Sequence, residues 1–269
     1  LYGGLWPLMD VEFLAHRFPA PFLSGIAFYR PYSRVAGGTA EYLANLFSQT
    51  YWRHWAGILA FTLLALAAWA VARGILSRFS GRPCGWPAAA FSGVVLILAG
   101  RLVAVTYILP MLAGLAAAWL YMALREAPES RRARVAVAAA SVLASIPLYH
   151  WLAAGFLYVC VMCALYEWLV RKRPVWSLLW IACGAAVPYG MSYVYYEPDV
   201  VARYLRWLRT PEFDPLSNGL LVAMYLFVPA GAAAGFLSAR FRVGGRFGPR
   251  VRRAAQAAGF AVLALLAWR

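Results

Sequence analysis

The chain has 269 residues, of which 64% are hydrophobic and only 13% are charged, and its formal net charge is +15. A soluble domain carries about 25% charged residues, so this composition excludes an ordinary soluble enzyme. With repeated apolar runs of about 20 residues, it predicts an all-α fold, a polytopic helical membrane protein. The basic residues lie in short segments between apolar runs and not on one soluble face, which argues against nucleic acid as a partner. Membrane lipids are the expected partners.

Residues 1–54 precede the first long apolar run and are predicted to form an extracytoplasmic segment. Its main feature is an amphipathic helix at about 39–53, which we expect to lie on the membrane and turn into the first span. Thr39 can cap this helix, and Leu43, Leu46 and Phe47 recur at helical spacing as its apolar face. Both ends of the chain look cut, so we expect a piece of a longer protein.

Seven or eight membrane spans make up the transmembrane bundle predicted for residues 55–269. An interfacial helix at about 199–209 interrupts them on the outer side. The spans are predicted at about 55–72, 86–100, 102–124, 135–148, 152–170, 175–196, 219–239 and 254–268.

The charges of the connecting segments predict the orientation. One side receives residues 73–87, 125–134, 171–174 and 240–253, with net charges of +3, +2, +3 and +6. The other side receives segment 197–218, with a net charge of −1. Cytoplasmic loops carry the excess of Lys and Arg. Residues 10–54 and 197–218 are therefore predicted to be extracytoplasmic.

An acidic pair, Asp10 and Glu12, lies early in the outer segment. Two carboxylates separated by one residue can share a divalent cation, or one of them can act as a catalytic base. They are the candidate catalytic residues and the candidate metal ligands. The alternative is a solvated loop that happens to be acidic.

Arginines occupy every third position within segment 197–218, at Arg203, Arg206 and Arg209. Guanidinium groups match the geometry of phosphate oxygens. We expect Arg203 and Arg206 to bind a lipid phosphate or pyrophosphate. The alternative is general headgroup contact, which any interfacial helix makes.

Four further polar residues map to the same outer face and complete a candidate substrate-binding set: His54, Arg101, His150 and Glu197. A lone histidine near an interface is more often structural than catalytic. Elsewhere, Glu167 is interpreted as the partner of Arg171 in an i,i+4 ion pair. Cys160 and Cys163 form a CxxC inside an apolar run, and we interpret them as packing residues because zinc would need four ligands.

Two stretches resemble an uncharacterised bacterial membrane family, domain of unknown function 6057. One is GGTAEYLANLFSQTYWRHWAG and the other is YHWLAAGFLYVCVMCALYE. The resemblance rests on Gly37, Gly38, Glu41, Tyr42, Gln49, Trp55 and Gly57 in the first, and on Tyr149, Trp151, Ala154, Gly155 and Glu167 in the second. It implies a multi-pass protein of the bacterial inner membrane and brings no established activity.

In architecture the chain is also similar to the multi-spanning lipid-linked glycosyltransferases of the GT-C class. The similarity implies a polyprenyl-phosphate-linked sugar donor, with Asp10 and Glu12 in the place of that class's acidic motif. Our leading hypothesis is therefore a transferase that uses a lipid-phosphate-linked sugar on the extracytoplasmic face. A non-catalytic membrane scaffold or assembly protein is the alternative. A transporter is the third, and it is disfavoured because no predicted span has an ionisable residue clearly at its centre.

Overall fold

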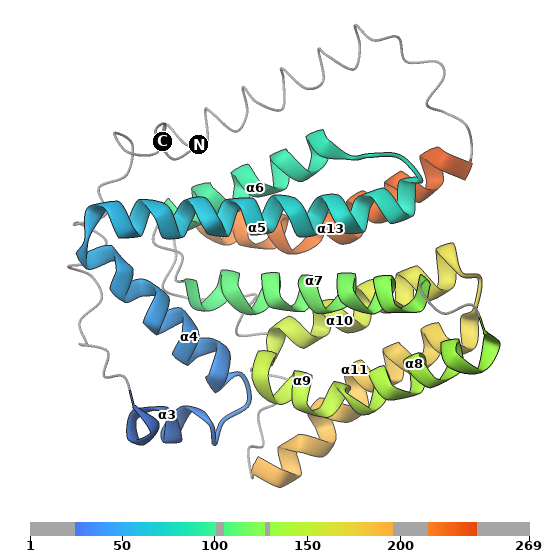
Figure 1. Ribbon diagram of the computed structural model, residues 1–269, viewed down its shortest axis with the longest axis horizontal. Helices are drawn as coiled ribbons and strands as arrows, with labels where there is room; N and C mark the ends of the chain where they lie inside the picture. Colours follow the sequence, from blue (N-terminus) through green and yellow to red (C-terminus); the bar gives the residue numbers. More distant parts are fainter. Residues whose placement is uncertain (1–24, 101–104, 127–129, 196–214, 241–269) are drawn as a thin grey trace, which may run out of the picture.

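The computed structural model describes residues 25–100, 105–126, 130–195 and 215–240, and these residues form helices and no strands (Figure 1). This confirms the predicted all-α class. The helices are α3 (Ile26–Tyr32), α4 (Gly38–Ser48), the 3₁₀ turn η1 (Gln49–Trp52), α5 (His54–Ser80), α6 (Gly85–Gly100), α7 (Val105–Glu126), α8 (Arg131–Leu143), α9 (Ser145–Leu152), α10 (Ala154–Leu165), the π-helix η2 (Tyr166–Val170), α11 (Pro174–Tyr195) and α13 (Pro215–Arg240).

The long helices run alternately in opposite directions, so their connections gather at two ends of the bundle (Figure 1). We call one the basic end. There α5, α7, η2 and α13 finish, and the described cations include Arg78, Arg82, Lys172 and Arg240. We call the other the α4 end, because α4 and α9 lie there beside the starts of α5 and α7.

The helices pack in two groups (Figure 1). The first group is α5, α6 and α13, and the second is α7, α10 and α11 with α8 and α9 along its edge. Contacts of α5 with α7 and of α10 with α13 join the groups. The core between them is apolar and includes both cysteines of the CxxC, Cys160 and Cys163, which are buried as packing residues.

Glycine allows α7 and α10 to approach closely at the centre of the bundle. A Cβ on Gly114 would lie 2.2 Å from the carbonyl oxygen of Gly155, and a Cβ on Gly155 would lie 2.1 Å from that of Pro110. Both distances are far below van der Waals contact. Small residues at such crossings let helix backbones pack directly, which is how helices associate in membranes.

Pro229 lies inside α13 and deprives one carbonyl of its helical donor, because proline has no N–H. That carbonyl belongs to Tyr225, four residues earlier. The hydroxyl of Tyr158, on α10, donates a hydrogen bond to it. The proline therefore leaves no unpaired carbonyl at this point, and the freed group ties α13 to α10.

Three described helices are long and apolar enough to cross a membrane: Trp55–Ser80, Tyr107–Glu126 and Pro174–Tyr193. A fourth span results if Val135–Leu143 and Ser145–Leu152, which meet at 42°, are counted as one broken span. Three further apolar helices are shorter, at Gly85–Ala99, Ala154–Val170 and Leu221–Leu237. The described helices thus support an integral membrane protein with three to four candidate spans, against the seven or eight predicted. The predicted run 254–268 lies outside the described residues.

The outward faces of the long helices are apolar as well. Leu63 on α5 is 56% exposed, Leu178 on α11 is 65% exposed and Leu226 on α13 is 61% exposed. A helix that is apolar all round belongs in a large core or in a membrane. Because these side chains face away from the bundle, a lipid environment fits them better than water.

Helix α4 differs from its prediction in its capping residue and in where it ends. Gly37, in the left-handed conformation at φ 80°, occupies the position before the helix, and Thr39 does not cap it. The buried face consists of small residues, including Ala40 and Ala44, whereas Leu43 is 46% exposed. Leu43 and Leu46 face away from the bundle, as an apolar face lying on a membrane would, and small residues form the face that packs. The helix also stops at Ser48, before the 3₁₀ turn.

Candidate functional site

Most of the residues predicted to form the site lie outside the described part of the chain. These are Asp10, Glu12, Arg101, Glu197, Arg203 and Arg206. His54 is the first residue of α5, where only its backbone position is described, and His150 lies on α9. Among the described residues, no group of three His, Cys, Asp or Glu side chains could hold a metal ion.

The described residues that flank the predicted site segments lie toward the same end of the bundle, spread from the end of α6 to the end of α11 (Figure 1). Gly100 and Val105 border the segment that contains Arg101, and α11 and α13 border the segment that contains Glu197, Arg203 and Arg206. These helix ends, with α3, α4 and the start of α5, all lie at the α4 end of the bundle.

Backbone contacts fix α4 against α9 at this end. The N–H of Gly37 donates a hydrogen bond to the carbonyl of His150, at 2.8 Å. A Cβ on Gly37 would lie 2.6 Å from the Cβ of Ala153, and Ala153 itself has a positive φ of 42°. Only glycine fits the left-handed conformation and the close approach together. The backbone of His150 therefore has a structural role at this contact.

An aromatic cluster joins α3 to α4. The ring of Tyr42 packs edge-on against Tyr29 and Tyr32, with ring centroids 5.0 and 5.7 Å apart. The hydroxyl of Tyr29 is 2.9 Å from that of Thr39, and the Asn45 amide donates a hydrogen bond to the Tyr32 hydroxyl. Polar tips on aromatic rings suit a membrane–water interface, where one side is apolar and the other wet.

A buried ion pair, absent from the sequence prediction, lies at the basic end. Arg125 Nε is 2.7 Å from Glu167 Oε1, and both side chains are fully buried. The hydroxyl of Tyr121 donates to the same carboxylate oxygen at 2.7 Å. The Arg125 guanidinium also lies over the rings of Tyr121 and Trp176. Two donors and two ring faces thus compensate for the removal of this pair from water.

The π-helix η2 explains why Glu167 does not pair with Arg171 as predicted. In η2 the N–H of Arg171 donates to the carbonyl of Tyr166, five residues earlier. The wider turn moves Arg171 out of the i,i+4 position above Glu167. The Glu167 side chain faces α7, where it pairs with Arg125. A charged residue inside an apolar run usually has such a partner, which is the sequence signal that could have indicated a distant pair.

A second ion pair lies beside the buried one and is partly exposed. Arg78 Nε is 3.2 Å from Glu126 Oε2, and the hydroxyl of Tyr166 donates to the other oxygen of Glu126 at 3.0 Å. The two networks use adjacent residues of α7 and adjacent residues of the α10–η2 helix. Together they link α5, α7 and η2 at the basic end.

The buried network retains an unused acceptor. The second carboxylate oxygen of Glu167 accepts no hydrogen bond within the described part of the chain. A buried polar atom of this kind is rare in proteins and is normally met by a partner or by water.

Arginines and tryptophans pair on the surface in the half of the bundle toward the basic end. The guanidinium of Arg73 lies 5.0 Å from the ring centre of Trp69, and that of Arg78 lies 5.6 Å from the ring centre of Trp119. Trp168, in η2, is 61% exposed. Tryptophan and basic residues concentrate where membrane spans meet the headgroup region.

Comparison with known families identifies a match along most of the chain. A model described as a family of unknown function (DUF6057) matches residues 22–251, and the chain belongs to this family. This confirms the resemblance seen in the sequence. No curated protein and no solved structure matched the chain.

Proposed function

We propose that this member of the DUF6057 family is a polytopic membrane protein that transfers a sugar or a similar group from a lipid-phosphate carrier at the α4 end of its bundle. One observation carries the proposal. The described helix ends that border the predicted site segments, together with His54 and His150, all lie at that end. Segments that are far apart in sequence therefore start and end on one face of the bundle, which supports a shared site there.

The membrane topology is part of the proposal. We infer seven or eight crossings, counting α5, α6, α7, α8–α9, α10–η2, α11 and α13, with the basic end in the cytoplasm of a bacterium. The alternating helix directions support this count. Residues 154–170 rise about 25 Å as a helix, and a bilayer thins locally around a short span at modest cost. The arginine–tryptophan pairs toward the basic end also suit one face of a membrane.

The chemistry follows from the residue types. Asp10 or Glu12 would act as the base that activates the acceptor, or the two would share a divalent cation. Arg203, Arg206 or Arg101 would hold the carrier phosphate, because negative charge develops on a leaving phosphate and fixed cations stabilise it. His54, His150 and Glu197 would border the same site.

The test is a transfer assay with the full chain in lipid nanodiscs that contain a polyprenyl-phosphate-linked, radiolabelled sugar, to which a membrane extract is added as the source of the acceptor. We expect release of the labelled sugar from the lipid, with the rate reduced about 100-fold or more in Asp10→Asn or Glu12→Gln, as loss of an acid–base group does. Arg203→Gln and Arg206→Gln should raise KM. Glu41→Gln is the matched control, because Glu41 is an exposed carboxylate at the same end.

Wild-type turnover in both acidic variants would overturn the catalytic assignment of Asp10 and Glu12. Absence of turnover in the wild-type chain, with a wild-type phenotype for both variants in cells, would favour the scaffold. Movement of the intact labelled lipid across the bilayer without release of the sugar would instead indicate a transporter.

A further inference from the structure

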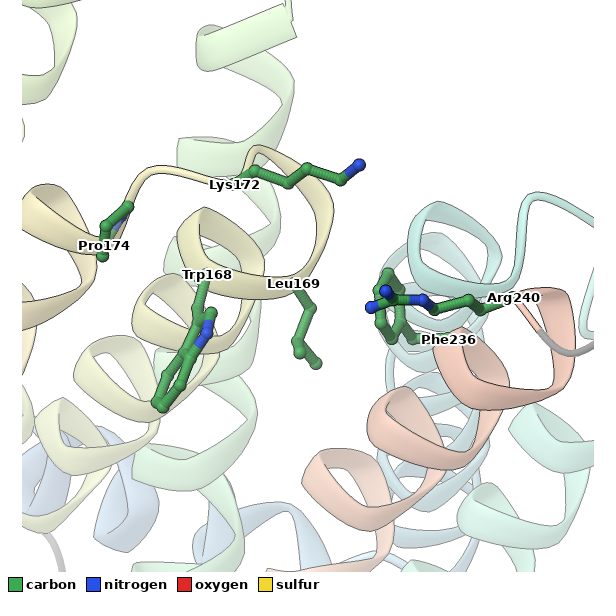
Figure 2. A pocket seen from close by; sticks show the side chains of 6 residues that line it. All are labelled: Trp168, Leu169, Lys172, Pro174, Phe236 and Arg240. Atoms are coloured by element: carbon green, nitrogen blue, oxygen red, sulfur yellow. The ribbon is translucent and has the colours of Figure 1, made fainter.

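Two adjoining hollows open at the basic end, between the region of η2 and the end of α13, and Figure 2 shows the residues that line the smaller one. Their volumes are about 360 and 400 Å³, and Leu169, Lys172, Phe236 and Arg240 line both. Arg78, near the end of α5, lines the larger one. We call the two hollows together the basic groove.

The charge of the basic groove is positive. Lys172 extends from one wall and Arg240 from the other, toward the opening between them (Figure 2), and both are exposed. No acidic residue is present among the described residues that line either hollow. Glu126 neutralises Arg78 from outside the groove, at 3.2 Å. Two cations facing one opening favour an anion between them.

The floor and rim of the basic groove are apolar. Leu169 and Phe236 are half-buried in its walls, and Trp168, which lines the smaller hollow, is 61% exposed. A free phosphate ion has no apolar part that could contact this surface. A phospholipid fits both parts of the groove, because its acyl chains can cover the aromatic and aliphatic side chains while its phosphate contacts the cations.

The backbone holds Lys172 in position at the rim. Its φ of 54° is in the left-handed region, which a residue with a side chain adopts infrequently. Hydrogen bonds on both sides enforce it, from the N–H of Arg171 to the carbonyl of Tyr166 and from the N–H of Arg173 to the carbonyl of Glu167. A strained conformation fixed by its surroundings is characteristic of functional positions. The turn therefore fixes the backbone at the rim from which the Lys172 side chain extends.

We propose that the basic groove binds the phosphate headgroup of an anionic phospholipid, with Lys172 and Arg240 contacting the phosphate and with Trp168 and Phe236 against the acyl chains. Basic pockets between membrane helices on the cytoplasmic side are known to accept such headgroups. The groove lies at the opposite end of the bundle from the proposed transfer site. The inference therefore holds whether or not the chain is a transferase.

The test measures lipid binding to the purified full chain in a neutral detergent, by native mass spectrometry during titration. The probes are phosphatidylglycerol, cardiolipin, phosphatidylcholine and inorganic phosphate. We expect saturable binding of the two anionic lipids and weaker binding of phosphatidylcholine. The double variant Lys172→Asn/Arg240→Gln should raise the dissociation constant of phosphatidylglycerol about thirtyfold. Each basic residue near an anionic lipid surface contributes about 1 kcal/mol of binding free energy, and the loss of two such contributions corresponds to about thirtyfold. Asparagine is chosen because it tolerates the left-handed conformation.

A matched control separates the groove from the general charge of this end. Arg82→Gln/Arg132→Gln removes two exposed arginines from the basic end that do not line the groove. We expect it to change the dissociation constant less than threefold. Equal losses in the two double variants would overturn the proposal in favour of diffuse attraction. Displacement of the lipid by millimolar phosphate would overturn it in favour of a free anion site.

Discussion

The two ends of the bundle are held together by different kinds of contact. At the basic end, ion pairs and tyrosine hydroxyls join side chains that are 40 to 48 residues apart in sequence. At the α4 end, backbone approach at glycine joins α4 to α9, and edge-on aromatic rings join α3 to α4. The difference indicates that charge fixes the end with the basic groove, whereas shape fixes the end where the proposed transfer site lies.

The largest effect is expected from breaking the buried pair. Arg125→Met or Glu167→Leu alone leaves one buried charge without its partner, which destabilises a protein by about 3–5 kcal/mol. The double variant replaces the pair by apolar side chains of similar size and should recover most of the loss. The measurement is the free energy of unfolding in mixed micelles, arranged as a double-mutant cycle. Single variants that cost less than about 1 kcal/mol would show that charge does not hold this end.

Gly37→Ala tests the role of shape at the α4 end. The new Cβ meets that of Ala153 at 2.6 Å, and the left-handed backbone adds strain, so we expect a loss of about 2–4 kcal/mol. Gly81→Ala is the control, because Gly81 has φ 65° and its Cβ would meet nothing within 4 Å; it should lose about 1 kcal/mol. Ala153→Gly should restore Gly37→Ala to the level of the control. Equal losses at Gly37 and Gly81 would leave only backbone strain as the cause.

Between the two ends, Tyr158→Phe removes the donor to the Tyr225 carbonyl that Pro229 leaves free. We expect the free energy of unfolding to fall by about 1 kcal/mol, since a hydrogen bond between membrane helices contributes only modestly to stability. Adding Pro229→Ala supplies a backbone N–H to the same carbonyl and should restore stability. If Pro229→Ala rescues nothing, the hydroxyl does not compensate for the proline. Unfolding monitored by tryptophan fluorescence reports both changes.

The smallest effect is expected for the exposed pair at the basic end. Arg78→Met or Glu126→Gln should lower the free energy of unfolding by less than about 1 kcal/mol, because side chains that are 20% and 43% exposed interact through a solvent-screened field. The loss should shrink further at high salt, unlike that of the buried pair. A cost similar to that of Arg125→Met would mean that the two networks act as one unit.

Some of the molecule was predictable because the relevant information is local. Apolar runs and their lengths predict the all-α class, and the charges of the connections predict that basic residues gather at one end. The two stretches that indicated the family also have physical roles in the structure: Gly37 and Gly155 allow close backbone approach, and Glu167 belongs to the buried pair.

Other features depend on distant partners or on packing. Glu167 and Arg125 are 42 residues apart, and the π-helix that separates Glu167 from Arg171 leaves no periodic signal. Hydrophobicity predicts an apolar face of α4 at Leu43 and Leu46, but it does not indicate that Ala40 and Ala44 pack against the bundle, because that depends on steric fit. The basic groove requires the end of α13 beside the turn after η2, which only the tertiary structure brings together.

The most direct test asks whether the two ends lie on opposite faces of a membrane. Arg34→Cys places a thiol on an exposed position at the α4 end, and Arg82→Cys places one at the basic end, each in a Cys84→Ser background. A membrane-impermeant maleimide applied to spheroplasts should label Arg34→Cys but not Arg82→Cys, and inverted vesicles should give the reverse. Labelling of both positions from the same side would contradict the separation of the α4 end from the basic end, and with it the placement of both proposed sites.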